Sequence, residues 1–222
     1  MESFNSVMNL NTKAIAFLMQ ESHLDCILAL QNALNRFKGS LPDTDVSMGG
    51  SNSSWAIHTV ELPRQGSICN DAFEIFNSAF VFLSERGYEG SDTTEGDERI
   101  IPAVLLYNLG LCHHRVALRE GDSDGLRAAS RFYSHALTLL ETVAHELTDS
   151  EMILLAALAN NMAQISSAFF DTKSTRAFQQ MLEDILEATD VECLEEEDSD
   201  LVFSMNLLMA SQLHLHGLAP AA

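Results

Sequence analysis

Apolar residues recur every three or four positions along most of this chain of 222 residues, which is the spacing of one helix face. The expected helices cover residues 5–20, 23–37, 102–118, 124–145, 148–170, 174–189 and 201–215. Capping residues precede some of them, as at Ser22–Asp25 and Thr148–Glu151. Because the connections between neighbouring helices are short, the pattern predicts helices that pair into antiparallel hairpins.

The segment between the second and third expected helices has a different pattern. Residues 55–62 alternate between apolar and polar, and the runs 73–76 and 80–83 are aromatic and β-branched. Such residues favour strands, so we expect a β-hairpin inserted between helical hairpins, with a single helix over Asn70–Glu85 as the alternative. A turn-rich linker precedes this insert, and an acidic, glycine-rich loop over residues 86–98 follows it.

A small residue stands at the same place in three of the expected helices, at Ala14, Gly110 and Ala163. In each case the next helix carries a small residue, followed four positions later by a large apolar one. These pairs are Cys26 and Leu30, Ala129 and Tyr133, and Ala177 and Met181. Small residues let two helices approach closely, and a final apolar helix would cap the row. The repeat resembles the tetratricopeptide-type helical hairpin.

This resemblance implies a mainly α fold, a right-handed stack of about three helical hairpins with an inserted β-hairpin and a C-terminal capping helix. We expect one domain over residues 1–222, with the first hairpin in 1–38, the insert in 39–98, and the second and third hairpins plus the cap in 99–222. Three further segments, together with the aromatic strand, resemble an uncharacterised expanded family in diatoms, which implies no activity. They are Tyr107–His114, Asn160–Ile165 and Ala219–Ala222.

The tetratricopeptide resemblance also implies a concave groove, lined by the first helix of each pair, that binds a peptide or a helix. The residues that fall on this groove are Asn11, Ile15, Leu18, Tyr107, Leu111, His114, Arg115, Asn160, Gln164 and Ser167. Relatives that grip a C-terminal carboxylate use Lys and Arg beside Asn, and this chain offers Lys13 and Arg115 at most. Asn108 and Asn161 are expected to bond between helices. The sequence therefore predicts a non-enzymatic protein-interaction module or scaffold.

The charge balance limits the class of partner. Twelve basic and 32 acidic side chains give a net charge of −20, which disfavours nucleic acid and anionic lipid and suits a protein or peptide with basic flanks. Such charge also serves simply to keep a monomer soluble. No signal peptide is expected in Met1–Val7, and the longest apolar run, Met152–Ala159, is too short to cross a bilayer. Scattered cysteines without a Cys-x-x-Cys pair indicate a reducing compartment, so we expect a cytoplasmic or nuclear protein.

Two other classes remain as alternatives. One is a small helical metal-dependent enzyme that uses His113 and His114, and the other is a structural assembly subunit. Adjacent helix residues point roughly 100° apart and do not easily share a metal, and His-x-x-x-His spacing is absent. Nucleotide-binding loops and nucleophile elbows are absent too. We therefore expect no catalytic residue, cofactor or metal, with His113 in packing and His114 facing the groove.

Overall fold

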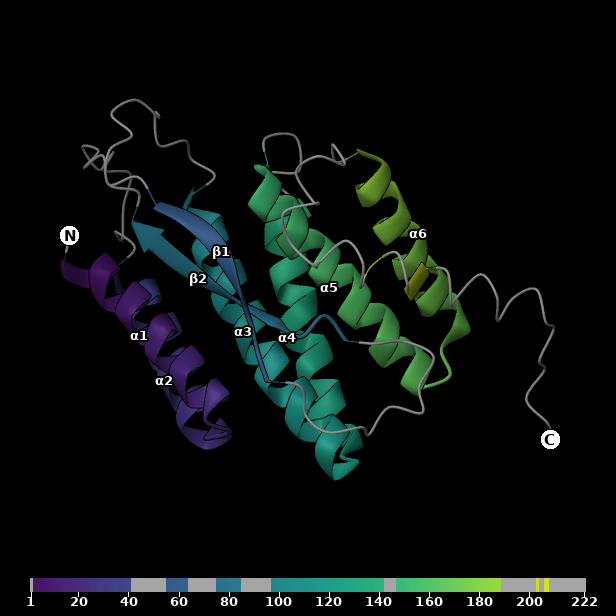
Figure 1. Ribbon diagram of the computed structural model, residues 1–222, viewed down its shortest axis with the longest axis horizontal. Helices are drawn as coiled ribbons and strands as arrows, with labels where there is room; N and C mark the ends of the chain where they lie inside the picture. Colours follow the sequence, from purple (N-terminus) through teal and green to yellow (C-terminus); the bar gives the residue numbers. More distant parts are fainter. Residues whose placement is uncertain are drawn as a thin grey trace. The chain divides into compact units, whose positions relative to one another are not determined.

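The structure is a computed structural model that describes residues 2–40, 55–63, 75–84, 97–141, 147–188, 203, 206 and 207. It is mainly helical with a small two-stranded antiparallel sheet (Figure 1). The helices are α1 (Glu2–Met19), α2 (His23–Ser40), α3 (Asp97–Glu120), α4 (Ser123–Glu141), α5 (Asp149–Ala168) and α6 (Thr172–Ala188). The strands are β1 (Trp55–Glu61) and β2 (Ser78–Ser84). Within the described ranges, no helix combines the length and apolar character that crossing a membrane requires.

The chain divides into two compact units. Unit 1 consists of Met1–Arg64 and Asn77–Ser150, and contains α1 to α4 and both strands. Unit 2 consists of Gln65–Phe76 and Glu151–Ala222, and contains α6 and nearly all of α5.

The three helical hairpins close in the same way. One or two residues after the first helix of each hairpin ends, the backbone is left-handed, with φ of 59° at Glu21, 68° at Gly121 and 58° at Phe170. The N–H of the next residue then donates to the carbonyl five positions earlier, at 2.9 Å in all three turns. These bonds run from Ser22 to Phe17, from Asp122 to Ala117 and from Asp171 to Ser166. This is the Schellman closure, which satisfies carbonyls that a helix end would otherwise leave unpaired.

The expected small residue at a helix crossing is confirmed at Gly110. A Cβ atom built there would lie 2.7 Å from Cε1 of the buried Tyr133 ring, so α3 and α4 can approach this closely only because the residue is glycine. The packing pair expected on α6 is wrong. Ala177 is exposed and Met181 is half-buried, because the apolar stripe of α6 instead buries Leu182 and Ile185.

The inserted β-hairpin is confirmed, and the alternative of a helix is wrong for Ser78–Ser84. The strands pair from Trp55 opposite Ser84 to Glu61 opposite Ser78, and Trp55 packs edge-on against Phe82 with ring centroids 5.2 Å apart. Phe76, which was expected in a strand, lies just before β2.

Two other expectations need a correction or fall outside the described residues. Helix α3 begins at Asp97, so Pro102 stands in its second turn and not in the first. Only residues 203, 206 and 207 of the expected cap over 201–215 are described, and they are helical. Residues 41–54 of the linker, residues 86–96 of the expected loop and the acidic connector over 190–200 lie outside the described residues. The end of that loop is corrected, because Asp97 and Glu98 already belong to α3.

Candidate protein-binding groove

Strand β2 lies against α1 and α3 in unit 1, and two asparagine side chains bind its main chain there. The Phe80 N–H donates to Asn108 Oδ1 at 3.0 Å, and Asn108 Nδ2 donates to the Phe80 carbonyl at 2.8 Å. Asn11 Nδ2 donates to the same carbonyl at 2.9 Å, and Asn11 Oδ1 accepts from Asn108 Nδ2 at 2.9 Å. In an antiparallel ladder, both main-chain groups of one residue point to the same side of the strand. The Asn108 carboxamide therefore stands where a further strand would pair with β2.

The chemistry of the side chain explains why asparagine occupies these positions. Asn11 and Asn108 are both fully buried. A buried main-chain N–H or carbonyl without a partner costs free energy, and a carboxamide carries the same donor and acceptor as a peptide group. Asn108 on α3 can therefore pair with the main-chain N–H and carbonyl of Phe80, which point away from β1. We call the two asparagines with the Phe80 main chain the asparagine clamp.

Aromatic side chains surround the clamp. The Tyr107 ring meets the Phe80 ring edge-on, with centroids 5.0 Å apart and an interplanar angle of 82°, and its hydroxyl donates to the Ser78 carbonyl at 3.1 Å. Behind it, the Tyr133 ring lies 5.6 Å from Tyr107, and its hydroxyl lies 3.4 Å from His114 Nδ1. The side of α3 expected to anchor a partner thus anchors the chain's own strand.

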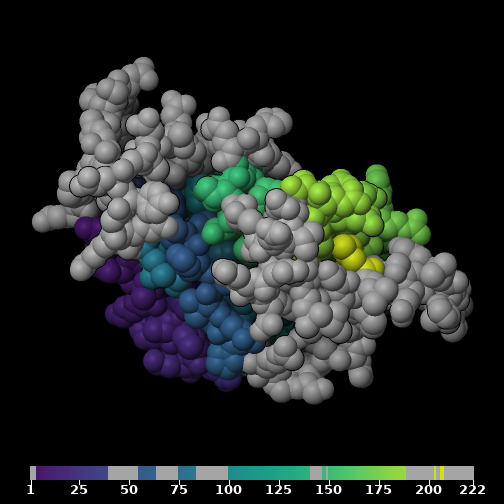
Figure 2. Space-filling model, turned by 45° about the horizontal axis from the view of Figure 1, so that its top comes forward, coloured from purple at the N-terminus to yellow at the C-terminus, as the bar shows by residue number. Residues whose placement is uncertain are grey.

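The structure buries all of the expected groove residues except Ser167, which is half-buried. The buried ones are Asn11, Ile15, Leu18, Tyr107, Leu111, His114, Arg115, Asn160 and Gln164. The expectation of an open groove is therefore corrected in unit 1. There, β2 covers the face of α1 and α3 that was expected to be exposed to a partner. Figure 2 shows the strands, in blue, at the surface beside α1, in purple. That a partner protein contacts these residues stays a prediction.

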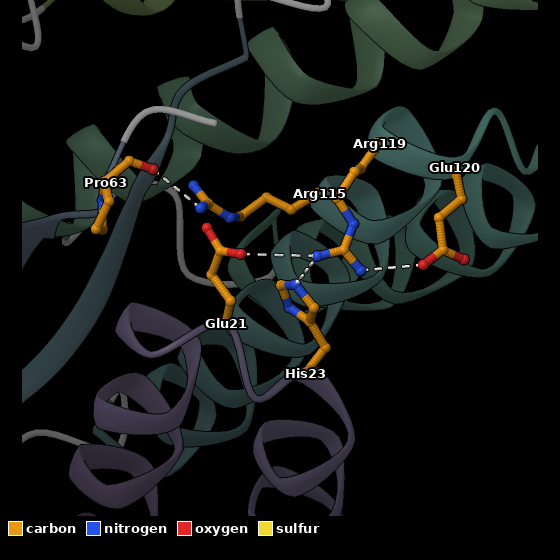
Figure 3. Close-up of polar contacts among 6 residues, drawn as sticks. All are labelled: Glu21, His23, Pro63, Arg115, Arg119 and Glu120. Carbon is orange, nitrogen blue, oxygen red and sulfur yellow. Dashed lines mark hydrogen bonds and ion pairs between the residues drawn. The ribbon is translucent and has the colours of Figure 1, made fainter. Parts of the chain in front are cut away.

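Arg115 fastens the far end of the hairpin. Its guanidinium donates to the Pro63 carbonyl at 3.0 Å (Figure 3) and to Asn77 Oδ1, so it binds the residues that follow β1 and precede β2. Asn77 in turn exchanges bonds with Leu62, donating from Nδ2 to its carbonyl at 2.9 Å and accepting its N–H at 3.1 Å. Arg115 is 2% exposed and has neutral acceptors, and burial lowers the pKa of its guanidinium.

A charged cluster lies beside Arg115 at the turn between α1 and α2 (Figure 3). Arg119 lies 3.9 Å from the Glu21 carboxylate, 3.0 Å from that of Glu120 and 3.1 Å from His23 Nε2. Burial, followed by the charges of Arg119 and Arg115, lowers the pKa of His23. The carboxylates of Glu21 and Glu120 pair with Arg119, so the cluster links the end of α3 to the turn between α1 and α2.

Unit 2 contains a second clamp of the same form. The Phe76 N–H donates to Asn161 Oδ1 at 2.8 Å, and Asn161 Nδ2 donates to the Phe76 carbonyl at 3.3 Å. Asn160 supports Asn161 at 3.2 Å and accepts from Asn206 Nδ2 at 2.7 Å, while Phe203 stacks on Phe76 at 4.9 Å. Two phenylalanines four positions apart in the sequence are thus bound by asparagines from two different units.

The sequence indicated the clamps only in part. A bond between helices was expected for Asn108 and Asn161, and the contact of Asn108 with Asn11 confirms it for α3 and α1. The bonds to Phe80 and Phe76 were missed. The available signal was that both asparagines stand two residues before the small residue of the repeat, at Gly110 and Ala163.

The histidines considered for a metal have other contacts. His113 stacks on Phe132 with centroids 5.4 Å apart, and burial followed by Arg131 lowers its pKa. Across the described parts of the chain, no group of three or more His, Cys, Asp or Glu side chains is placed to hold a metal ion. No protein-family model, curated protein or solved structure matches this chain.

Proposed function

We propose that the protein is a non-enzymatic protein-interaction module, a right-handed stack of tetratricopeptide-like helical hairpins with a C-terminal capping helix. Its groove binds an extended polypeptide through the main chain. In this arrangement the segment around Phe80 is a built-in occupant of the groove, and a partner binds by taking its place.

The observation that carries the proposal is the two-point contact of Asn108 with Phe80. Main-chain recognition of this kind accepts many sequences, and side-chain pockets then supply the specificity. The edge-on contact of Tyr107 with Phe80 supplies a specific contact for an aromatic side chain. A partner segment is therefore expected to be extended and to carry an aromatic residue at the place of Phe80.

Charge supplies the second element of specificity. The net charge of −20 favours a partner whose aromatic segment has basic flanks, and such long-range attraction mainly accelerates association. The tethered strand competes at an effective concentration that is in the millimolar range for short flexible connections. A partner therefore has to bind tightly, or bind when the hairpin has been released.

Exchange of the strand tests the proposal. Protease sites are introduced within residues 64–74 and 85–96, and the folded protein is cut at both. A fluorescent peptide with the sequence of residues 75–84 is then added, and its polarisation reports binding. We expect exchange in the cut protein, weaker binding to the uncut chain, and competition by the unlabelled peptide.

Two controls distinguish specific binding of the peptide from non-specific binding. A scrambled peptide of the same composition should not bind, because the clamp needs Phe80 in register. Tyr107→Phe removes the hydroxyl contact with Ser78 and should weaken the binding of the peptide by a factor of about 2–10, the value of one net hydrogen bond. Absence of exchange, or equal binding of the scrambled peptide, would rule out a peptide-binding groove.

A further inference from the structure

A pocket of about 410 Å³ lies on the side of α1 that faces away from the clamp. Asn5, Asn9 and Lys13 follow one another at intervals of four along one stripe of this helix. Asn11 stands roughly 200° from Asn9 around the helix axis, which separates the pocket from the groove. The lining residues are Asn5, Ser6, Asn9, Leu10, Lys13 and Arg36.

The charge of this pocket is opposite to that of the chain. Its lining contains two cations and no carboxylate, in a protein with 32 acidic and 12 basic side chains. Among the residues that the structure describes, no carboxylate forms an ion pair with Lys13 or Arg36. Arg36 donates to Ser6 Oγ, and Lys13 lies 5.4 Å from the centroid of the Phe17 ring. Among the described residues, the contacts of both cations are thus with neutral groups, and no carboxylate compensates their charge.

The donors around the cations define the class of that ligand. Asn5 and Asn9 bring carboxamides, and both side chains are exposed, as are those of Lys13 and Arg36. We propose that this pocket binds a phosphate monoester, with its oxygens between Lys13 and Arg36 and its organic part against Leu10. A dianion matches two cations, and three terminal oxygens use more donors than the two of a carboxylate.

The proposed phosphate site does not depend on the proposed peptide groove. The net charge of the chain makes the proposal more specific. A surface at −20 repels phosphate in general, so binding has to come from local contacts. The monoester can belong to a small molecule or to a phosphorylated side chain of a protein, and both present the same group to Lys13 and Arg36. The arms of the experiment distinguish these two sources.

The test is an NMR titration of the full-length chain with phenyl phosphate at constant ionic strength. We expect saturable shifts of amides in α1 and near Arg36. Lys13→Gln and Arg36→Gln should each weaken binding about tenfold or more, because each removes a charge-assisted contact. Lys38→Gln is the matched control, since it removes the same charge from α2 outside the pocket, and should change the Kd less than about twofold.

Three outcomes would overturn the proposal. They are the absence of saturable shifts, an equal loss of affinity in Lys38→Gln, and binding of benzoate as tight as that of phenyl phosphate. A phosphoserine peptide and its unphosphorylated form are titrated next. Tighter binding of the phosphorylated peptide assigns the site to modified protein, and binding of phenyl phosphate but of neither peptide assigns the site to small molecules. Equal binding of the two peptides would again contradict recognition of the phosphate.

Discussion

The groove face and the outer face of α1 carry the same type of side chain for different purposes. Asn11 on the groove face is fully buried and binds the Phe80 carbonyl and Asn108, whereas Asn5 and Asn9 on the outer face are exposed. A buried carboxamide has to find protein partners, while an exposed one bonds to water and exchanges it for a ligand. The comparison teaches that burial, and not residue type, decides whether an asparagine holds the fold or is available for binding.

The largest effect expected is that of Asn108→Ala. It leaves the buried Phe80 N–H without its acceptor and removes two donated bonds, so we expect the free energy of unfolding to fall by about 3 kcal/mol. Asn9→Ala, the control on the outer face, should change it by less than about 0.5 kcal/mol. Urea unfolding followed by circular dichroism measures both. Equal effects at the two positions would break the comparison.

The next effect concerns the helix crossing behind the groove. Gly110→Leu drives a side chain into the buried Tyr133 ring, and we expect a loss of about 1–3 kcal/mol in the free energy of unfolding. Gly39→Ala is the matched substitution on α2, where nothing lies within 4 Å of the added Cβ. It should be neutral or stabilising by up to about 1 kcal/mol, because alanine favours a helix. A denaturant midpoint unchanged by Gly110→Leu would contradict the close crossing.

A smaller effect is expected for Asn11→Ala. The Phe80 carbonyl keeps its bond from Asn108, so only the second bond and the support of Asn108 are lost. We expect a decrease of about 1–2 kcal/mol in the free energy of unfolding. Thr12→Ala, on the exposed next position, should stay within about 0.5 kcal/mol. If Thr12→Ala proved the more damaging, the assignment of the two faces would be reversed.

The smallest effect is a pH dependence at the turn between α1 and α2. Burial lowers the pKa of His23 below its usual value of 6.5, so the unfolded chain binds the proton more readily than the folded protein. The contribution of His23 to stability is thus present above pH 6.5 and is lost as the pH falls below it, towards the lowered pKa. Urea midpoints between about pH 7.5 and 5.5 should fall more steeply for the wild type than for His23→Gln. Parallel profiles would show that this histidine titrates as it does in the unfolded chain.

Local patterns in the sequence were sufficient to predict a mainly helical protein with a two-stranded sheet. The helices and the two strands follow from the spacing of apolar residues, because that spacing decides which face each element can bury. Gly110 was assigned to a helix crossing because a small residue recurs at that place in three of the expected helices. Errors arose where the pattern tolerates a small shift, as on α6, where the buried residues are Leu182 and Ile185 and not the expected pair.

The site was predictable only as a set of residues on one side of the helices. Helical spacing predicted one surface for Asn11, Tyr107 and Arg115, and in the structure each of them binds a main-chain carbonyl of the strands or of the residues that flank them. The sequence did not determine what covers that surface. Asn108 contacts Phe80, which is 28 positions away in the sequence, and Asn11, which is 97 positions away. Such long-range contacts depend on how the insert packs against the helices.

The sequence by itself thus determined the elements, the hairpin turns and the residues that share a helix face, because neighbours within a few positions set these features. Only the tertiary structure decided that β2 lies against α1 and α3, that the asparagines bind its main chain, and that exposed polar residues of α1 line a pocket on its other face. Main-chain hydrogen bonds carry no residue code. When a carboxamide binds the main chain of a strand, the asparagine can be recognised in the sequence of the helix. The sequence of the strand contains no corresponding signal.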